Sequence, residues 1–402
     1  MSKTTFSILS SILLSTAMAL PATARTTTPQ HRVPHMPSVF ARHFGDRFAE
    51  PRSNRSAHSA KPNVQKPVRP DSGNYEIIDH PNADPSWGTR LVGINENSHG
   101  SGYYLNKDDG TFHAFLRKSD SDFVDIQIGA NDTFGGELND KDETYGSYID
   151  NDTGVENAWV RTKNGAVIPI QVPDGTGGSF GQFINNKGVL SGNYLDDNGV
   201  IHTFTRTRSG VIAELADAPK SDLGSQGIGI NNKGDIAGGA FDSDYHMIGF
   251  IRFAGGRYTE FEAPDAGPGE GQGTEAYEIN EQGRTNGQVV DANDVYHGFI
   301  RYPDGKFTIV DAPDAGTGSG QGTFAVEHCE GGWCVGEYID SNDVSHGYYC
   351  TDYCKKRGEI FEFDPPNAGT GTYLVISSNK SHQITGTFKD DNAVRHGFIR
   401  TP

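Results

Sequence analysis

Short apolar runs separated by turns recur along the chain from Asn74 onward. In one stretch the pattern predicts four strands, at residues 274–280, 287–290, 297–301 and 306–311. Asp-Gly and Asn-rich turns between β-branched and aromatic runs are hairpin signals. The pattern therefore predicts antiparallel strands that follow one another in sequence.

Three anchors repeat in seven copies. An Asn-type residue ends the first strand, a Gly follows it by seven residues, and an aromatic segment such as His297-Gly-Phe-Ile-Arg301 begins ten or eleven residues after the Gly. The first anchors are spaced by 44, 46, 46, 49, 49 and 50 residues, at Asn95, Asn139, Asn185, Asn231, Asn280, Cys329 and Asn379. A four-stranded unit that repeats at this interval is typical of a β-propeller blade.

The two ends of the repeat array complement each other. The last copy has three strands before Pro402, whereas residues 75–79 resemble the fourth strand at 307–311. We therefore predict an all-β fold, a seven-bladed β-propeller of four-stranded blades, whose ring is closed by an N-terminal strand that completes the last blade. Closure removes the open edges that a linear array exposes.

The third anchor carries a family resemblance. Residues 112–117, Phe-His-Ala-Phe-Leu-Arg, and their relatives in the other copies resemble the extracellular HAF-repeat family, which is named for its His-Ala-Phe motif. The resemblance covers roughly residues 75–402, although Asn157 and Ile248 replace the His and Cys350 replaces the Arg. It implies a secreted bacterial repeat protein, and the family brings no agreed activity.

The first 73 residues differ from the repeats. Lys3, an apolar run from Phe6 to Leu20 and the small residues at 22–24 are typical of a cleaved signal peptide and too short to span a bilayer comfortably. Residues 25–73 hold Pro, Ser, His and Arg without hydrophobic periodicity, which predicts a disordered linker or propeptide. We expect a signal peptide at 1–24, this linker at 25–73 and the propeller at 74–402, in a protein secreted to the periplasm or beyond, with no membrane span.

Charge is divided between the same regions. Residues 1–73 carry ten Lys and Arg against three acids, which leaves 24 basic and 49 acidic residues in the remainder. An acidic body repels phosphate backbones, so nucleic acid is excluded as its partner. Cations, neutral glycans and basic peptides are compatible with this charge.

Four cysteines lie within 26 residues, at Cys329, Cys334, Cys350 and Cys354. In an oxidising compartment we favour two local disulfides, Cys329–Cys334 and Cys350–Cys354, because a turn separates the members of each pair. A four-thiolate zinc site is the alternative. Its spacing is unusual and export disfavours zinc thiolates, so we expect no metal at these residues.

The loops that follow the second and fourth strands are expected at one end of the ring. Each loop after a second strand carries two acids, and residues 150–154 are compatible with half of a Ca²⁺ loop, although Asp and Asn also cap their own turns. We therefore favour turn chemistry and expect no cofactor, with Ca²⁺ as the less favoured interpretation. The repeated histidines are expected to tie strands to neighbouring loops, since blades separate them around the ring.

Function is expected where the repeats differ. The second positions of the first strands should surround one mouth of the central channel and bind a ligand: Arg90, Phe134, Phe180, Gln226, Glu275, Phe324 and Tyr373. Aromatic rings stack on sugars and polar groups orient hydroxyls, although the same residues also suit packing of the channel neck. We predict a monomer that binds an extracellular glycan or protein without turnover. The alternative is a polysaccharide lyase or glycosidase with Glu275, Asp265 and Arg90 as catalytic candidates, and a third is a structural surface protein.

Overall fold

The computed structural model describes residues 73–118, 122–355, 360–369 and 372–402, and within these ranges it does not describe the side chains of residues 325–330 and 372–376. The expected signal peptide and the linker up to residue 72 lie outside the described residues. The described chain contains 28 strands and one short 3₁₀ turn, η1 (Asp352–Cys354).

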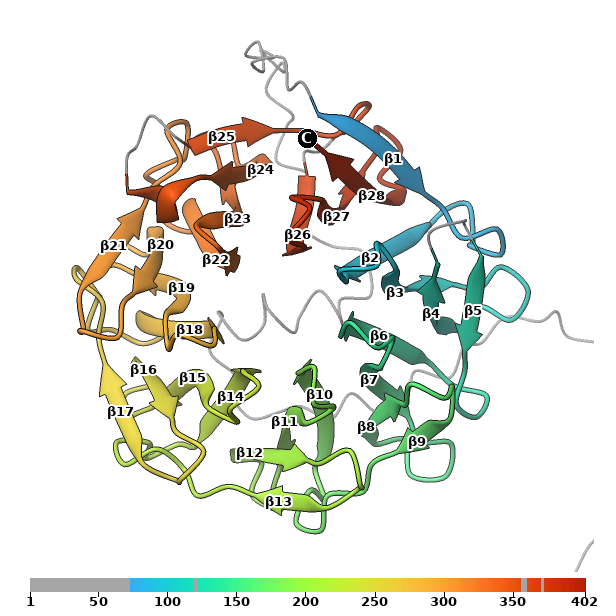
Figure 1. Cartoon of the computed structure of the whole chain (residues 1–402), viewed down its shortest axis with the longest axis horizontal. Coiled ribbons are helices and arrows are strands. Elements are labelled where there is room, and N and C mark those ends of the chain that lie inside the picture. The colour runs from blue at the N-terminus through green and yellow to red at the C-terminus, as the bar shows by residue number, and fades with distance from the viewer. Residues whose placement is uncertain (1–72, 119–121, 356–359, 370–371) are drawn as a thin grey trace, which may run out of the picture. The chain divides into compact units, whose positions relative to one another are not determined.

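The strands are arranged radially as seven groups of four, which we call blades 1 to 7 in the chain order of their inner strands (Figure 1). The inner strands are β2 (Thr89–Ile94), β6 (Thr133–Leu138), β10 (Gly178–Ile184), β14 (Ser225–Ile230), β18 (Gly273–Ile279), β22 (Gly322–Glu330) and β26 (Thr372–Ser378). The second strands are β3 (Gly100–Leu105), β7 (Thr144–Ile149), β11 (Leu190–Leu195), β15 (Ile236–Phe241), β19 (Thr285–Val290), β23 (Trp333–Ile339) and β27 (Ile384–Lys389).

The third and outer strands complete each blade. The third strands are β4 (Phe112–Arg117), β8 (Glu156–Arg161), β12 (Ile201–Arg206), β16 (Met247–Arg252), β20 (Tyr296–Arg301), β24 (Ser345–Cys350) and β28 (Arg395–Thr401). The outer strands are β5 (Phe123–Ile126), β9 (Val167–Pro169), β13 (Ile212–Glu214), β17 (Tyr258–Phe261), β21 (Phe307–Val310), β25 (Ile360–Phe363) and β1 (Asn74–Ile78). Neighbouring strands within each blade are antiparallel, as the hairpin turns require.

The outer position of blade 7 is filled by β1. It pairs antiparallel with β28 in a register that runs from Asn74 opposite Thr401 to Ile78 opposite Gly397. The order β1-β28-β27-β26 therefore joins the first described strand to the last three (Figure 1).

The repeated Gly of the second strand allows a close approach to the inner strand. A Cβ atom on Gly102 would lie 2.0 Å from the Arg90 carbonyl oxygen, and one on Gly238 would lie 2.0 Å from that of Gln226. Since no side chain tolerates such a contact, this position requires Gly in the sequence. A β-bulge follows in the inner strands of blades 1 to 5, between this close approach and the turn.

The core lies between blades. The aromatic residue of the third anchor is at most 1% exposed in every blade: Phe115, Trp159, Phe204, Phe250, Phe299, Tyr348 and Phe398. These rings pack in clusters that cross from blade to blade, such as the one in which Phe250, Ile230 and Ile236 of blade 4 meet Phe183 and Val189 of blade 3. Burying an aromatic side chain stabilises a fold by roughly 1.5–3 kcal/mol, so the seven rings account for much of the cohesion between blades.

The first-anchor asparagines form a chain of hydrogen bonds from blade to blade. The Nδ2 atom of Asn139 donates to the backbone oxygen of Asn185 at 2.8 Å, and Asn185 donates in the same way to Asn231 at 2.8 Å. Equivalent bonds run from Asn95 to Asn139, from Asn231 to Asn280 and from Asn379 to Asn95. The last of these joins blade 7 to blade 1. One side-chain type thus links six of the seven blades near the channel.

Candidate functional site

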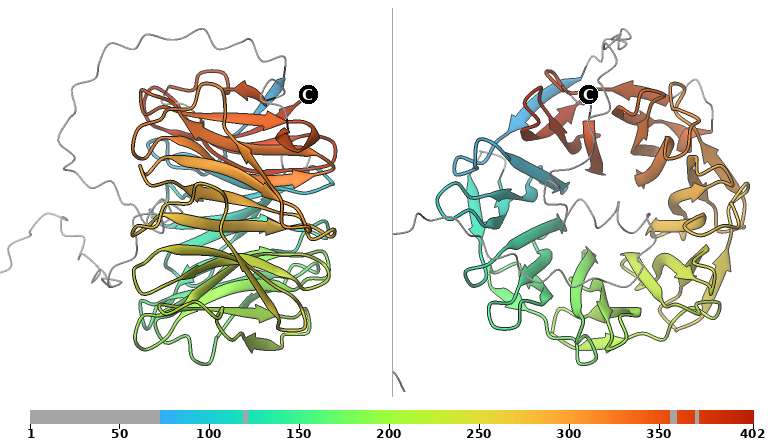
Figure 2. Two further views of the ribbon diagram at one scale, coloured as in Figure 1. Left: turned by 90° about the vertical axis from the view of Figure 1, so that its left-hand side faces the viewer. Right: turned by 180° about the vertical axis from the view of Figure 1, so that it is seen from behind.

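The two faces of the ring carry different loops. Inner and third strands run in the same direction, so the connections into them lie at one end of the blades, which we call the top face. The connections that leave these strands lie at the other end, the bottom face. Figure 2 shows the connections gathered at the two faces.

Acidic residues are concentrated at the top face. The connections there contain 26 Asp and Glu residues and two basic residues, Lys107 and Lys220. The described connections of the bottom face contain nine acidic and eleven basic residues, and five third strands end there in Arg. The net negative charge of the propeller therefore belongs to one face, where it creates a potential that attracts cations.

In blades 2 to 7 the first Asp of the second-to-third connection organises its own turn. Oδ1 of Asp291 accepts hydrogen bonds from the backbone N–H groups of Asn293 and Val295, and Asp390 does the same for Asn392 and Val394. These N–H donors hold the pKa of Asp390 below its usual range. These hydrogen bonds are the turn chemistry that we favoured.

The third-strand histidines of blades 3, 5, 6 and 7 bridge two acids within their own blades. Nδ1 lies 2.7–2.9 Å from a carboxylate oxygen at the end of the outer strand, in the pairs His202–Asp217, His297–Asp311, His346–Asp364 and His396–Asp79. Nε2 lies 3.6–3.9 Å from the turn acid Asp196, Asp291, Asp340 or Asp390. Because a carboxylate only accepts, Nδ1 is the donor in the short bond. Each histidine therefore fixes a third strand between two top-face loops.

These acids change the titration of two of the rings, those of His297 and His346. The hydrogen bond to Asp311 raises the pKa of His297 above its ordinary value, against a smaller opposing effect of burial. Burial alone would lower the pKa of His346, but the hydrogen bond and charge of Asp364, with the charge of Asp340, outweigh it and raise the pKa. The charged imidazolium is thus favoured at these positions.

Sequence reasoning missed the outer acid of these bridges. An acid followed two residues later by Pro comes one to three residues after the outer strand, at Asp79, Asp217, Glu262, Asp311 and Asp364. The recurrence of this acid was a signal for its contact with the histidine. It carried no meaning without the knowledge that the outer strand ends beside the histidine of the third strand.

The residues expected at the channel mouth are mostly buried. Arg90, Phe134 and Phe180 are 6–7% exposed, Gln226 is 1% exposed and Glu275 is 2% exposed. Phe324 is half-buried and stacks on Tyr296 at 4.2 Å between ring centres. The side chain of Tyr373 lies outside the description. Ligand contact by these residues stays a prediction, and in the structure they serve as packing between blades.

Two contacts illustrate this packing. The Arg90 guanidinium donates to the hydroxyl of Tyr103 at 2.8 Å, and Phe134 of blade 2 packs edge-on against the same ring at 5.5 Å. The catalytic candidates are not brought together, since Arg90 is in blade 1 and Glu275 is in blade 5, while Asp265 is exposed in a top-face loop. No described contact joins the three.

Glu275 is held by neutral donors. Its carboxylate accepts hydrogen bonds from the hydroxyl of Tyr277 at 2.8 Å, from the amide of Gln288 at 3.4 Å and from the amide of Gln226 in blade 4. Burial raises the pKa of Glu275 to about 7, and the three donors offset only part of this shift. The group is therefore a buried acid that titrates near neutral pH.

The Gly-rich loops are fastened by a glutamine that we did not single out. Gln272 accepts a hydrogen bond from the N–H of Gly269 at 3.0 Å and donates to Asp294 at 2.8 Å. Gln321 repeats both contacts with Gly318 and Asp343 in the next blade. The loops are thus tied to the neighbouring turn and form fixed parts of the top face.

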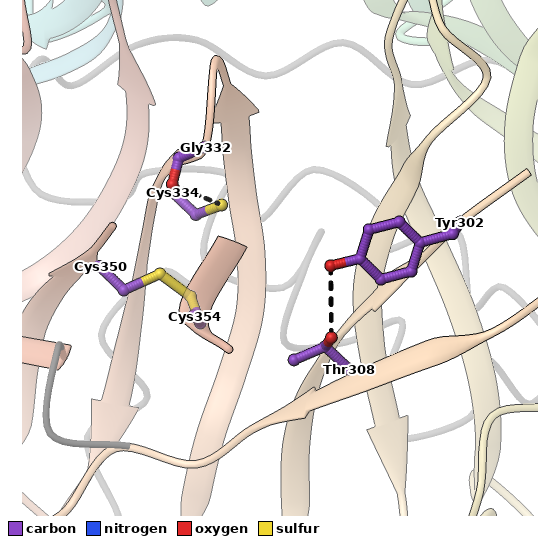
Figure 3. The surroundings of a disulfide bond; sticks show 6 residues. All are labelled: Tyr302, Thr308, Gly332, Cys334, Cys350 and Cys354. Carbon is purple, nitrogen blue, oxygen red and sulfur yellow. Dashed lines mark hydrogen bonds between the residues drawn. A yellow bond between two sulfur atoms is a disulfide. The ribbon is translucent and has the colours of Figure 1, made fainter. Parts of the chain in front are cut away.

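The cysteines lie at the bottom end of blade 6. Cys350 and Cys354 form a disulfide with a Cα–Cα distance of 5.2 Å, and the sulfur of Cys334 lies close to it (Figure 3). Cys334 is also disulfide-bonded, and the backbone register sets it opposite Cys329. The predicted Cys350–Cys354 pair is therefore confirmed. The side chain of Cys329 is outside the description, so its pairing stays a prediction.

No family model and no curated protein matches the sequence. Solved structures do match. A streptogramin B lyase aligns with 82% of this chain and 98% of its own at 12% identity and a TM-score of 0.55. A catalytically inactive variant of virginiamycin B lyase from Staphylococcus aureus, with quinupristin, aligns with 82% of this chain and 99% of its own at 14% identity and a TM-score of 0.54.

A third neighbour is a propeller domain. The β-propeller domain of the Trilobed protease from Pyrococcus furiosus aligns with 77% of this chain and 95% of its own, at 11% identity and a TM-score of 0.50. At these identities the likeness concerns the fold alone. This chain is a β-propeller.

The propeller accounts for the described strands without membrane helices. Within residues 73–118, 122–355, 360–369 and 372–402, no helix has the length and apolar character needed to cross a bilayer.

Proposed function

We propose that this propeller is a secreted, non-catalytic binding protein whose top face holds an extracellular ligand, and that the ligand is a cationic protein or peptide. The observation that carries the proposal is the division of charge, with 26 acidic and two basic residues in the top-face connections. Complementary charge steers association and favours partners of opposite sign. A Lys-rich or Arg-rich segment fits this face, whereas an anionic glycan is repelled.

The shape of the face supports the same ligand class. The central residues are buried, and the loops are tied by Asp turns, His bridges and the Gln272 and Gln321 contacts described above. A rigid surface loses little conformational entropy when a partner binds. A flexible basic segment that spreads over many exposed carboxylates suits it better than a small molecule that needs a deep pocket.

A fluorescent deca-lysine peptide tests the proposal with the full chain. We expect binding that weakens steeply between 20 and 150 mM NaCl. Replacing four exposed top-face acids with Asn, at Asp108, Asp152, Asp244 and Asp391, should weaken binding about tenfold, since exposed charge pairs are worth about 0.2–1 kcal/mol each.

The control variant removes four negative charges from the bottom face instead of the top face. Glu96, Asp122, Asp304 and Asp352 are exposed, and each forms an ion pair with a lysine. Replacing them with Gln or Asn should leave affinity within about twofold. Equal weakening by both sets, or no binding by the parent chain, would contradict a top-face site.

The second candidate is the secreted lyase or glycosidase, and one observation favours it. Glu275 is a buried carboxyl whose pKa of about 7 suits a general acid or base. Assays for unsaturated products and for new reducing ends, run on a panel of polysaccharides, separate the two functions. Turnover that Glu275→Gln abolishes would replace the binding proposal with the enzymatic one.

A further inference from the structure

An open cleft lies on the bottom face beside the seam between blades 5 and 6. Its volume is about 540 Å³, within the range of about 300–1,000 Å³ that is usual for small-molecule sites. The hairpin between β20 and β21 forms most of the wall, and the segment after η1 adds one residue from blade 6. The lining includes Tyr302, Asp304, Lys306, Phe307, Thr308 and Lys355.

The wall from blade 5 carries aromatic rings and hydroxyl groups. Tyr302 and Phe307 are half-buried, and the hydroxyl of Tyr302 lies 3.4 Å from that of Thr308 (Figure 3). A hydroxyl both donates and accepts hydrogen bonds, while an aromatic ring packs against an apolar surface. A sugar ring, which has an apolar face and several hydroxyls, matches this wall.

The two lysines of the cleft are held by weak ion pairs. Nζ of Lys306 lies 2.8 Å from Asp304, and Nζ of Lys355 lies 3.1 Å from Asp352. The four side chains are between 47% and 81% exposed. Because water and salt screen exposed pairs of this kind, an anionic ligand can compete with the two aspartates for the ammonium groups.

An arginine without an acidic partner lies beside the cleft. The guanidinium carbon of Arg284, which precedes β19, lies 3.8 Å from the ring centre of Tyr353 and 5.2 Å from that of Tyr302. No carboxylate of the described chain forms an ion pair with it, and its Nε atom is buried without a hydrogen-bond partner. A guanidinium binds a carboxylate with two parallel hydrogen bonds. Since Tyr302 also lines the cleft, an unpaired positive charge stands next to the lining.

The wall from blade 6 is held in a strained conformation. The three residues of η1 have φ values of 46°, 59° and 51°, in the left-handed region that is unfavourable for residues with a Cβ atom. The disulfide described above fastens this turn, and the N–H of Tyr353 donates to the carbonyl of Gly332 at 2.9 Å. Strained backbone clusters at functional sites. Here it places Tyr353 against Arg284 and sets Lys355 at the cleft.

We propose that this cleft binds a uronic acid residue of an anionic glycan. Lys355 and Arg284 bind its carboxylate, and the hydroxyls of Tyr302 and Thr308 bind its ring hydroxyls. A sugar acid uses all of these groups, whereas an acidic peptide uses the cations alone. The site is on the opposite face from the acidic surface and does not depend on the cationic partner proposed there.

Titration calorimetry of the full chain with trigalacturonate at 20 mM NaCl tests the site. We expect binding, and we expect the fully methyl-esterified trimer, which lacks the negative charges, to bind at least tenfold more weakly. The double variant Arg284→Gln, Lys355→Gln should also weaken binding of the acid at least tenfold. The matched control, Lys163→Gln with Lys187→Gln, removes two exposed positive charges from the bottom face of blades 2 and 3 and should stay within about twofold of the parent.

A second variant distinguishes loss of the site from loss of the fold. Asp304→Asn with Asp352→Asn releases both lysines from their ion pairs and should tighten binding of trigalacturonate at least threefold. Asn also tolerates the left-handed φ of residue 352. A damaged fold does not bind more tightly, so this gain reports the cleft itself.

Four outcomes would overturn the proposal. They are no binding of trigalacturonate by the parent, equal binding of its methyl ester, equal weakening by the Arg284 and Lys163 double variants, and weaker binding by the double Asn variant. Hexaglutamate that binds as tightly as trigalacturonate, with the same loss in the Arg284 double variant, would replace the glycan with an acidic peptide. None of these measurements uses deca-lysine, so the proposed function of the top face stands or falls separately.

Discussion

Loss of one asparagine from the blade-to-blade chain should destabilise the whole propeller. Asn185 is 4% exposed. Its Nδ2 atom donates to the Asn231 carbonyl at 2.8 Å, and its Oδ1 atom accepts from the N–H groups of Lys187 and Val189 at 3.0 Å each. Asn185→Ala removes all three hydrogen bonds and leaves their partners at a site with little access to water.

The expected magnitude follows from these contacts. A hydrogen bond contributes about 1 kcal/mol net, and a buried group left without a partner costs about 1–3 kcal/mol. We therefore expect the free energy of unfolding to fall by about 3 kcal/mol. In a domain of this size roughly 2 °C of melting temperature corresponds to 1 kcal/mol, so the melting temperature should fall by about 6 °C.

Urea unfolding followed by tryptophan fluorescence and calorimetric melting both measure the effect. The control is Asn164→Ala, which removes an exposed Asn in the hairpin between β8 and β9 and should change stability by no more than about 0.5 kcal/mol. If the two variants lose the same small amount, the asparagine chain does not hold the blades together.

Three further predictions concern titration and the disulfide, each measured as a difference from the parent in urea unfolding. Asp311 raises the pKa of His297, so the charged form stabilises the fold fully below about pH 6.5, and this contribution is lost as pH rises through the raised pKa. His297→Gln should therefore lower the free energy of unfolding more at pH 6 than at pH 8. The pKa of Glu275 is about 7 against an ordinary 4.5, so ionisation costs stability as pH rises between these values. Glu275→Gln should therefore gain about 3 kcal/mol at pH 8 relative to its effect at pH 4.5, and a pH-independent effect would contradict a buried acid. The double variant Cys350→Ser, Cys354→Ser opens a five-residue loop, and its free energy of unfolding should fall by about 2 kcal/mol relative to the oxidised parent. If the same fall is measured relative to a fully reduced parent, the bond is not formed.

The repeat itself was predictable because its signals are local. The strands expected at residues 274–280 and 297–301 are β18 (Gly273–Ile279) and β20 (Tyr296–Arg301), since turn residues and β-branched runs act over a few positions. The repeated Gly was also visible, because a close backbone approach admits no other residue. Expectations of this kind depend on the chain within one blade.

Contacts between blades were not predictable in the same way. Gln226 and Glu275 are 49 residues apart and occupy the same position in the inner strands of two neighbouring blades. The sequence does not show that their side chains form a hydrogen bond. Asn185 is a second example. Its place at the end of a first strand is visible in the sequence, but its hydrogen bond to the carbonyl of Asn231 depends on the position of blade 4. Five of the residues expected to bind a ligand are buried, because alternate side chains of an inner strand can point to a neighbouring blade, as Phe134 does toward Tyr103.

The pairing of β1 with β28 also sets the order of events during synthesis. β1 is made first among the described strands, and its partner is made more than 300 residues later. At about 5–20 residues per second, the edge of β1 waits for tens of seconds, and an unpaired edge is a template for association with other chains. A growing chain therefore needs its last strand before the ring is complete, and loss of the residues from Arg395 onward should leave β1 without its partner and favour aggregation over folding.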